Sequence, residues 1–296
     1  MDLSIIIVNW NVKELILRLI SSIFKYSSGL KYEIIVIDND SKDGSIDALK
    51  ETFREALDKG QLKIIANNYN AGFAKANNQG WQKASGHYLL FMNPDMELME
   101  NSFEKMLNFM DSNSAYSAAT CRLLYADKSL QPNIKSFPRL TDQLLVILKL
   151  HHFLKFLPSL KRYLMKGFDY LEEIPVDQIM GAFVFIRREA FENVGTWDES
   201  YWLWWEDVEL CKRLNDAGSK IAFTPITQII HYEGKSFVQT FGLKKQKRFN
   251  RGMLNYFKKH RPKHEYYILW LCQPLSLLLT LITQVLKIKA RPQSRI

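Results

Sequence analysis

Short apolar runs alternate with amphipathic stretches through the first third of the chain. Four runs are almost wholly apolar, as expected of strands that are buried on both faces, and they lie at 3–8, 33–37, 62–66 and 88–92. Between them, apolar positions recur at helical spacing in 15–23, 45–59 and 71–84. Strands that alternate with helices in this way predict an α/β fold, with a mostly parallel central sheet flanked by helices.

The residues that follow these four strands are unusually polar. In an open α/β sheet, ligands bind beyond the carboxyl ends of the strands, so these loops are the first place to look for chemistry. The loops read Asn9-Trp10-Asn11, Asp38-Asn39-Asp40-Ser41, Asn67-Asn68-Tyr69-Asn70 and Asn93-Pro94-Asp95. Asn and Asp also form turns and helix caps, an alternative that explains one loop more readily than all four. We therefore predict a ligand site at this edge of the sheet.

Composition and missing motifs narrow the function classes. The 296 residues are 47% hydrophobic and 24% charged, which excludes a disordered or low-complexity chain. The first strand is not followed by a GxGxxG sequence and no Walker A sequence occurs, so a dinucleotide-binding oxidoreductase loses its main support. Three widely spaced cysteines without a CxxC pair favour neither a disulfide framework nor a thiolate zinc site, and they fit a reducing cytosol.

The net charge of +9 is concentrated in three segments. Residues 143–168, 235–263 and 287–296 together hold 19 Lys and Arg and no Asp or Glu, so the rest of the chain carries a net charge of −10. The basic and aromatic residues of 235–263 would also suit a nucleic-acid-binding surface. The uncharged segment that follows them favours anionic lipid, so we expect a membrane surface as partner and no nucleic acid.

The two ends of the chain differ in character. The N-terminal residues lack a basic region and their apolar run stops at Asn9, so we expect no signal peptide. Residues 266–286 contain no charge and have basic residues on both sides. About 20 apolar residues span a bilayer, but Gln, Pro, Ser and Thr dilute this run, and the two basic flanks define no orientation. A helix or broken hairpin in one leaflet is favoured over a true span and over a buried core helix.

A second basic segment lies in the middle of the chain. Residues 142–168 show a Leu- and Phe-rich pattern at helical spacing, with Lys and His between the apolar positions. Such an amphipathic segment lies on a membrane surface or covers the core with a solvated basic face, and both interpretations stay open. An apolar strand pattern follows at 181–187, and a last strand pattern ends at His231.

A series of motifs spans residues 3–236. It consists of the runs 4–11, 36–45 and 70–80, then Asn93-Pro94-Asp95, Gly181-Ala182-Phe183, Trp197-Asp198-Glu199, 206–210 and the stretch from His231 to Ser236. In content and order these motifs resemble those of the family 2 glycosyltransferases, and among them the rhamnosyltransferase-like branch. The resemblance implies a GT-A fold and the inverting transfer of a sugar from a nucleotide donor to a hydroxyl acceptor.

The resemblance also suggests how the chain is divided. Residues 1–125 are expected to form the nucleotide-sugar-binding half, and 126–236 the acceptor and catalytic half, of one GT-A domain. Residues 237–296 are expected to form a basic and apolar, membrane-associating helical segment. This would place the protein on the cytoplasmic side of the cell membrane, as a peripheral protein or with a single C-terminal anchor.

A sugar donor of this kind leaves as a diphosphate, and a divalent cation with hard ligands neutralises the developing charge. The resemblance places Asp95 and His231 at a Mg²⁺ or Mn²⁺ ion, although Asn93 stands where the family often has the first carboxylate of a D-x-D motif. A purely structural histidine is the alternative. Asp38 matches the residue that reads the nucleotide base. The other candidates for donor binding are Asn9, Asn11, Asn70, Gly72, Asn77 and Asn93.

The acceptor hydroxyl needs a general base, because it is a poor nucleophile while it keeps its proton. Asp207, at the start of a predicted helix, matches the family's base position, and a single displacement gives inversion at the anomeric carbon. The alternative is that Glu206, Asp207 and Glu209 are first-turn acids favoured by the helix dipole. The candidates for acceptor binding lie in the same segment and are Asp198, Glu199, Trp202, Trp204 and Glu206.

These observations predict a metal-dependent glycosyltransferase that acts on a lipid-linked or cell-surface glycan precursor. A non-catalytic, membrane-associated scaffold that binds sugar nucleotides is the alternative, since the metal motif has a single carboxylate. The branch favours a rhamnose-like donor, with UDP- and GDP-sugars as rivals. The sequence names neither the acceptor nor the oligomeric state.

Overall fold

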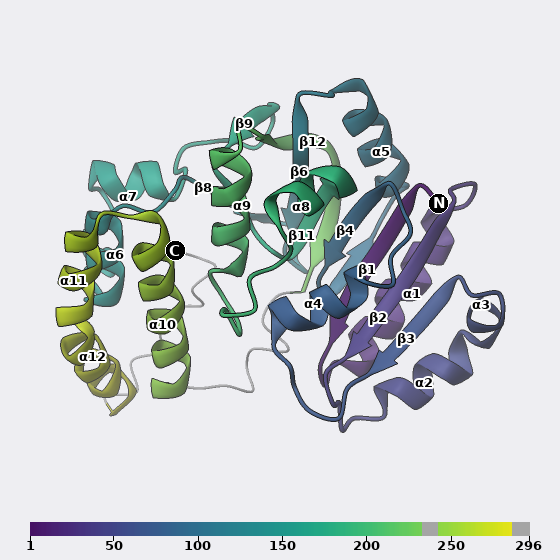
Figure 1. The fold of residues 1–296 in the computed structure, drawn as a ribbon, viewed down its shortest axis with the longest axis horizontal. Helices are drawn as coiled ribbons and strands as arrows, with labels where there is room; N and C mark the ends of the chain where they lie inside the picture. The colour runs from purple at the N-terminus through teal and green to yellow at the C-terminus, as the bar shows by residue number, and fades with distance from the viewer. Residues whose placement is uncertain (233–241, 286–296) are drawn as a thin grey trace.

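The computed structural model describes residues 1–232 and 242–285, which form a mixed ten-stranded sheet with helices on both faces (Figure 1). The strands are β1 Leu3–Asn9, β2 Tyr32–Asp38, β3 Leu62–Ala66, β4 Tyr88–Met92, β5 Met96–Leu98, β6 Tyr116–Leu124, β7 Leu130–Gln131, β8 Ile134–Lys135, β9 Ile174–Val176, β10 Gln178–Ile179, β11 Phe183–Arg187 and β12 Lys220–His231. The helices are α1 Lys13–Tyr26, α2 Ser45–Thr52, α3 Arg54–Asp58, α4 Phe73–Trp81, α5 Ser102–Ser112, α6 Leu140–Ile147, α7 Pro158–Tyr163, α8 Arg188–Val194, α9 Glu206–Asp216, α10 Leu243–His260, α11 Lys263–Leu271 and α12 Gln273–Val285, with a 3₁₀ turn at Leu150–His152.

The first half of the sheet confirms the predicted α/β arrangement. β3, β2, β1 and β4 lie side by side and parallel, in a register that sets Asn9 opposite Asp38. Their continuous apolar runs feed two cores, since successive side chains point to opposite faces of a sheet. Ile5 and Ile7 pack with α1 and α5 on one face, whereas Ile6 packs with α4 and α9 on the other.

The second half of the sheet corrects the expectation of a mostly parallel sheet. β11 lies between β4 and β6 and is antiparallel to both, β12 is parallel to β6, and β5 pairs antiparallel with β12. The apolar run at 181–187 predicted a buried strand there, which β11 confirms. A strand that is buried on both faces has the same pattern in either direction, so the periodicity did not reveal its orientation.

Residues 142–168 do not form the continuous amphipathic segment that the sequence predicted. α6 ends before Lys149, which adopts a left-handed conformation with φ of 60°. Pro158 begins α7 and, because proline cannot continue a preceding helix, separates it from the 3₁₀ turn. Asp142 and Ile147 of α6 are fully buried, so α6 covers the core, while Phe153 and its neighbours Leu150 and Phe156 are exposed.

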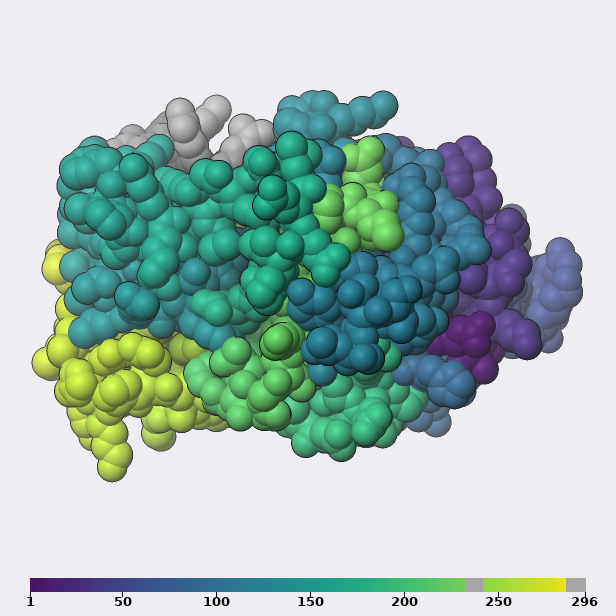
Figure 2. Space-filling model, turned by 90° about the horizontal axis from the view of Figure 1, so that it is seen from above, coloured from purple at the N-terminus to yellow at the C-terminus, as the bar shows by residue number. Residues whose placement is uncertain are grey.

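The last three helices form one end of the molecule, away from β1–β3 (Figures 1 and 2). α10 and α11 pack with α6 around an apolar cluster whose largest members include Tyr201, Trp205 and Tyr256. α11 and α12 are bent by 41° against each other. Their exposed apolar side chains, which we name the apolar face, are Tyr267, Ile268, Trp270, Leu271, Leu275, Leu278, Leu281, Ile282 and Val285.

Within the described residues, no single helix is long and apolar enough to cross a membrane, although the bent pair α11–α12 passes the test of length and composition together. The run 266–286 therefore forms two helices with a break at Cys272. The basic flank 287–296, the start of the predicted segment at 237–241 and the end of the motif series at 233–236 lie outside the described residues.

Candidate active site

The polar residues that follow β1 and β2 form one buried network. Asn9 Nδ2 donates to Asp38 Oδ1 (2.7 Å) and to Ser41 Oγ (3.2 Å), and the Ser41 amide donates to Asp38 Oδ2 (2.9 Å). Asn11 Oδ1 accepts from the Lys42 amide (2.7 Å), which ties the two loops together. Asn9 and Asp38 are fully buried, and Asn9 Oδ1 has no hydrogen-bond partner in the described part of the chain. A buried acceptor of this kind would be satisfied by an N–H or O–H of a ligand.

The loop before α4 lies directly against the aromatic segment that precedes α9. The Gly72 amide donates to Asn70 Oδ1 (3.0 Å), and the Phe73 amide donates to the Trp202 carbonyl (2.8 Å). Gly72 has φ of 85°, and a Cβ at this position would lie 2.6 Å from the Trp202 oxygen. The close backbone approach that glycine permits here is made by the protein's own chain. Asn77, on α4, is buried and donates to the Phe73 carbonyl (3.0 Å).

Asn93, Asp95 and His231 meet where β5 pairs with the end of β12. Asp95 Oδ1 and Asn93 Nδ2 each lie 3.3 Å from His231 Nε2, and Gln131 Oε1 lies 2.8 Å from His231 Nδ1. In the tautomer whose Nδ1 donates to this Gln131 oxygen, the neutral ring carries its lone pair on Nε2. Asp95 and His231 are both buried. The predicted pair thus places a carboxylate oxygen and an imidazole nitrogen side by side.

Asp95 and His231 supply fewer ligands than a complete metal site made by the protein alone. Among residues 1–232 and 242–285, no group of three or more His, Cys, Asp or Glu side chains is arranged to hold a metal ion. A carboxylate oxygen and a ring nitrogen 3.3 Å apart nevertheless fit two ligands of one cation, since ligands at about 2.0–2.2 Å from a metal lie roughly 3 Å apart. A cation bound there would take its remaining ligands from substrate or water.

The dipeptide Gly181-Ala182 connects this pair with the predicted general base. The Ala182 carbonyl accepts from the Asn93 amide (2.9 Å), and the Gly181 amide donates to Asp207 Oδ2 (2.9 Å). The other Asp207 oxygen accepts from the Val208 amide (2.8 Å) at the first turn of α9. Asn93 and Asp207, which are more than a hundred residues apart in the sequence, are therefore held on adjacent residues of one turn.

Burial controls the protonation of the two acids that begin α9. Burial raises the pKa of Asp207 above its usual range, although the Gly181 and Val208 amides and the charge of Lys135 oppose the shift. Burial and the neighbouring Asp207 raise the pKa of Glu206 much further. Glu206 Oε2 has no hydrogen-bond partner among the described residues, and the side chain is 5% exposed. Glu206 therefore favours its neutral form, whereas Asp207 ionises more easily.

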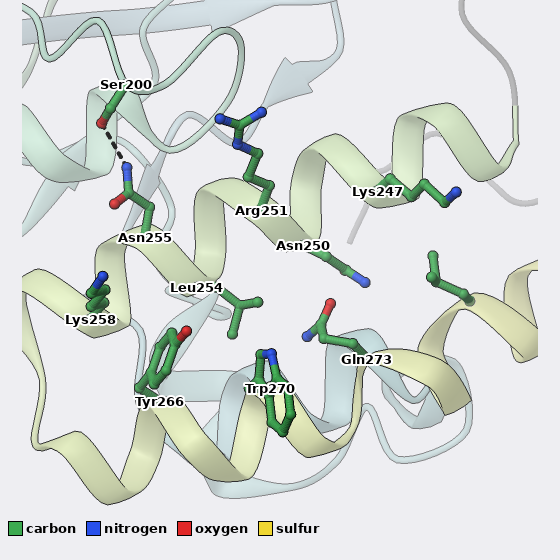
Figure 3. A pocket seen from close by; sticks show the side chains of 11 residues that line it. Ser200, Lys247, Asn250, Arg251, Leu254, Asn255, Lys258, Tyr266, Trp270 and Gln273 are labelled. Atoms are coloured by element: carbon green, nitrogen blue, oxygen red, sulfur yellow. Dashed lines mark hydrogen bonds between the residues drawn. The ribbon is translucent and has the colours of Figure 1, made fainter.

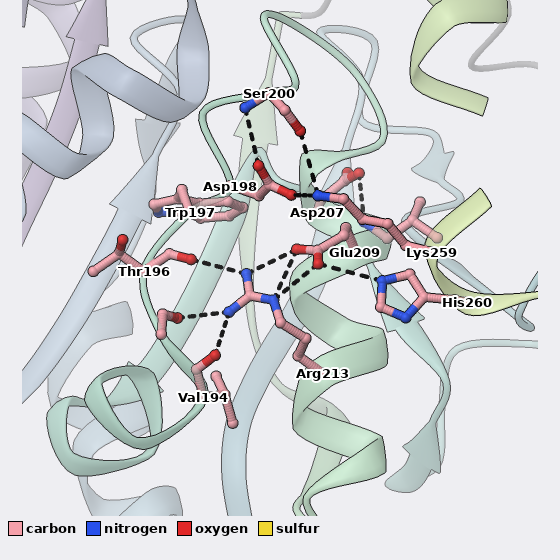
Figure 4. Close-up of polar contacts among 12 residues, drawn as sticks. Val194, Thr196, Trp197, Asp198, Ser200, Asp207, Glu209, Arg213, Lys259 and His260 are labelled. Carbon is pink, nitrogen blue, oxygen red and sulfur yellow. Dashed lines mark hydrogen bonds and ion pairs between the residues drawn. The ribbon is translucent and has the colours of Figure 1, made fainter. Parts of the chain in front are cut away.

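Asp198 and Glu199, which the sequence predicts to bind acceptor, connect the loop to neighbouring elements. Asp198 forms an ion pair with Lys259 of α10 and accepts from the Ser200 amide (2.9 Å) (Figure 4). Burial opposes its ionisation, but these two partners hold the pKa of Asp198 below its usual range. Glu199 Oε1 accepts from Asn78 Nδ2 (2.9 Å). Both carboxylates help to fix the position of the loop.

Arg213 holds the preceding loop, a role that the sequence analysis missed. Its guanidinium donates to the carbonyls of Val194 (2.6 Å), Gly195 (2.7 Å) and Thr196 (2.8 Å) and to both oxygens of Glu209 (Figure 4). Glu209 also contacts His260 of α10 (3.3 Å). The i, i+4 spacing of Glu209 and Arg213 was the available signal for the pair, but the three carbonyls come from a distant segment.

α10 lies over the aromatic segment. The Arg248 guanidinium stands 3.8 Å from the centre of the Trp202 ring, and Lys245 stands 5.4 Å from the centre of the Trp204 ring. Both tryptophans are half-buried, while Trp205 is buried in the cluster formed with α10. Trp202 and Trp204 are therefore partly exposed, and cations of α10 lie over both rings.

Comparison with family models identifies two regions of the chain. The model described as glycosyl transferase family 2 matches residues 4–195. A second model, described as the N-terminal domain of galactosyltransferase, matches residues 164–235. The two matches together include every predicted site residue.

Two relatives of similar length carry rhamnosyltransferase names. The chain is 26% identical over 206 residues to the rhamnosyltransferase WbbL of Escherichia coli, which covers 68% of this chain and 73% of the relative. It is 23% identical over 214 residues to the N-acetylglucosaminyl-diphospho-decaprenol L-rhamnosyltransferase of Mycobacterium tuberculosis, covering 69% and 67% of the two chains. A mannosyltransferase from Pyrobaculum calidifontis, solved with GDP-Man and Mn²⁺, shares the GT-A fold with a TM-score of 0.57 and 15% identity, covering 99% and 77%.

Proposed function

Because the chain belongs to glycosyl transferase family 2, we propose that it transfers a rhamnose-like deoxysugar from a nucleoside diphosphate to a hydroxyl of a lipid-linked or cell-surface glycan precursor, with inversion. The names of the two rhamnosyltransferase relatives support the choice of sugar. The observation that carries the proposal is the Gly181-Ala182 turn, which holds Asp207 on one residue and the Asn93 loop on the next. That arrangement supports a site in which Asp207 would act as base near the proposed metal ligands.

The donor would bind along the carboxyl ends of β1 to β4. Asn9, Asn11 and Asp38 would face the nucleotide, with Asp38 as the acceptor for the N–H of its base. Asn70, Gly72 and Asn77 would border the ribose and diphosphate, since Asn70 and Gly72 directly precede α4 and Asn77 lies on it. The buried and unpartnered Asn9 Oδ1 supports a ligand that donates a hydrogen at this place.

Asp95 and His231 would hold a divalent cation, Mg²⁺ or Mn²⁺, beside the donor diphosphate. The support is their 3.3 Å separation and the lone pair on His231 Nε2. When bound, the cation would neutralise the negative charge that develops on the leaving diphosphate. Gln131 Oε1, 2.8 Å from His231 Nδ1, would keep the ring in place.

Asp207 would take the proton from the acceptor hydroxyl as the new bond forms. Its raised pKa supports this role, because a carboxylate of higher pKa is a stronger base. The Gly181 and Val208 amides would keep the carboxylate aimed in one direction. The acceptor sugar would lie against Trp202 and Trp204, with Asp198, Glu199 and Glu206 shaping the loop around it.

The proposal predicts separate effects on donor binding and on transfer. Asp207→Asn should lower transfer by about 10²–10⁴-fold while leaving unchanged the thermal stabilisation by donor with Mn²⁺. Asp216→Asn is the control, because Asp216 is an exposed acid at the far end of the same helix. The measurements are thermal unfolding with dTDP-, UDP- and GDP-sugars, with Mn²⁺, Mg²⁺ or EDTA, and transfer to a lipid-linked acceptor.

Either of two results would contradict the enzyme proposal. If no donor stabilises the folded protein, with or without metal, the donor site is absent. If Asp207→Asn transfers sugar as well as the unchanged chain, Asp207 is not the base. Unchanged biological function of this variant would favour the non-catalytic scaffold.

We further propose that the enzyme works at the cytoplasmic face of a membrane. The apolar face of α11 and α12 supports this, because nine large apolar side chains on two neighbouring helices are left exposed. The basic residues of α10 stand next to them and favour an anionic surface. Flotation with phosphatidylcholine vesicles that contain phosphatidylserine tests this, and a protein that stays at the bottom of the gradient with these vesicles overturns it.

A further inference from the structure

A pocket of about 540 Å³ lies between α10 and the pair α11–α12. Asn250 and Leu254 of α10 point toward Gln273 and Trp270 on the other side (Figure 3). Neither the predicted donor site nor the predicted base contributes a residue to it. The pocket is therefore a separate feature of the helical end of the molecule.

Three cations line this pocket and are not neutralised. Lys247, Arg251 and Lys258 lie on one face of α10, are exposed, and form no ion pair within the described residues. Their neighbours differ, since Lys259 pairs with Asp198 and Arg261 pairs with Glu265. No acid is among the residues that line the pocket. Three unpaired cations with long flexible side chains favour a ligand that carries more than one negative charge, such as a diphosphate.

The opposite wall of the pocket is apolar and continues into the apolar face. Trp270 and Leu277 line it, and Trp270 is itself 54% exposed. From there the exposed side chains run along α12 to Val285. A cationic wall opposite an apolar wall that leads onto a hydrocarbon-like surface is complementary to an amphiphile with a phosphate head and an apolar tail.

The pocket also reaches the loop that leads to the predicted base. Ser200 lines it, accepts from Asn255 Nδ2 (2.7 Å), and donates its amide to Asp198. A sugar attached to a phosphate in the pocket would therefore be directed toward the segment between Asp198 and Asp207. We propose that this pocket binds the diphosphate of a lipid-linked sugar acceptor, an inference that rests on the proposed function and selects the lipid-linked class of acceptor.

The test compares two triple variants in the full-length protein. Changing Lys247, Arg251 and Lys258 to Gln should weaken binding to phosphatidylcholine vesicles that contain a long-chain prenyl diphosphate by at least about tenfold. The control changes Lys244, Lys212 and Lys220 to Gln, which removes the same charge from positions outside the pocket. It should bind within about twofold of the unchanged chain. Vesicles with phosphatidylserine at equal charge, and inorganic diphosphate in solution, should both bind more weakly than the prenyl diphosphate.

The outcomes separate this inference from the proposed function. If both triple variants lose the same amount of vesicle binding, or if the unchanged chain binds both kinds of anionic vesicle equally, the cations form a general electrostatic surface. Either result would overturn the proposal that the pocket binds a diphosphate. If inorganic diphosphate binds as tightly as the vesicles do, the lipid tail contributes nothing and the ligand is not a lipid-linked diphosphate. The pocket variant should keep donor-dependent stabilisation, because its residues lie outside the donor site. If the unchanged chain lacks that stabilisation, it is the proposed function that fails.

Discussion

At the scale of single residues, Gly72 carries a constraint that no other residue type meets easily. Its φ of 85° is strained for any residue with a side chain, and a Cβ would also lie 2.6 Å from the Trp202 carbonyl. Gly72→Ala should therefore lower the free energy of unfolding by about 2–4 kcal/mol, as measured by denaturant unfolding. Gly29→Ala is the matched control, because Gly29 has φ of 89° but open space around it.

The control separates backbone strain from the steric clash. Gly29→Ala should cost only the strain of a positive φ, about 1 kcal/mol. Equal losses in the two variants would mean that the Trp202 loop moves away without cost, and that the contact between α4 and the aromatic segment is weak.

The position of a residue at a strand end is easier to predict from the sequence than a contact with a distant partner. Asn9, Asp38, Asn93 and Asp95 could be found because each follows a recognisable apolar run. The role of Arg213 could not, since its three carbonyl partners come from a loop whose position depends on how α8 and α9 pack. Such contacts have no fixed spacing in the chain.

At the scale of elements, Glu33 ties β2 to its neighbours through a buried carboxylate. It accepts hydrogen bonds from Ser4 of β1 (2.7 Å) and Ser85 (2.6 Å) and pairs with Lys63 of β3. Burial alone would raise its pKa, but these partners more than offset it and lower the pKa of Glu33 to about 2. The folded state therefore binds this proton less readily than the unfolded state does.

The sign of the pH dependence follows from that difference. The stabilisation is fully present above the unfolded pKa of about 4.5 and is lost as the pH falls toward 2. Glu33→Gln should be less stable at pH 7 by on the order of 3 kcal/mol, and the difference should shrink between pH 4.5 and 2. Chemical unfolding at a series of pH values measures this, and a constant difference down to pH 2 would contradict it.

Elements with one clear periodicity were predicted closely, and elements interrupted by single residues were not. β3 and β4 occupy the predicted ranges because their boundaries coincide with changes in hydrophobicity. The segment 142–168 divides into shorter pieces because Lys149 turns left-handed and Pro158 ends the preceding pattern. The apolar residues keep a spacing of about 3.6 residues across such breaks, so the hydrophobic pattern cannot show where a helix ends.

At the scale of the whole molecule, the resemblance supplied what periodicity could not. The strand order β3-β2-β1-β4-β11-β6-β12 brings Asp95 beside His231, and the Gly181-Ala182 turn links the Asn93 loop to Asp207. Apolar patterns give neither the order nor the direction of the later strands. The ordered motifs indicated the GT-A fold, but the sheet expected from the sequence was still mostly parallel, and β11 and β5 run antiparallel to their neighbours. The motifs do not extend to α10–α12, where charge and hydropathy were the available guides.

Leu269 and Leu271, two residues apart on α11, separate the folding role of this helical end from its proposed membrane role. Leu269 is fully buried in the cluster with Trp205 and Tyr256, whereas Leu271 is 69% exposed. Leu269→Ala should lower the free energy of unfolding by about 2–5 kcal/mol and leave vesicle binding of the folded protein unchanged. Leu271→Ala should leave stability within about 0.5 kcal/mol and weaken vesicle binding by about tenfold, since a leucine that enters hydrocarbon contributes about 1.5–3 kcal/mol.

The two measurements are denaturant unfolding and flotation with phosphatidylcholine–phosphatidylserine vesicles, made on both variants. If Leu271→Ala destabilises the protein as much as Leu269→Ala does, the apolar face packs against protein and not against lipid. If neither variant changes vesicle binding, the cations of α10 hold the surface to the membrane without the apolar face. The opposite effects of two neighbouring leucines therefore test whether one short helix serves the fold with one side and the membrane with the other.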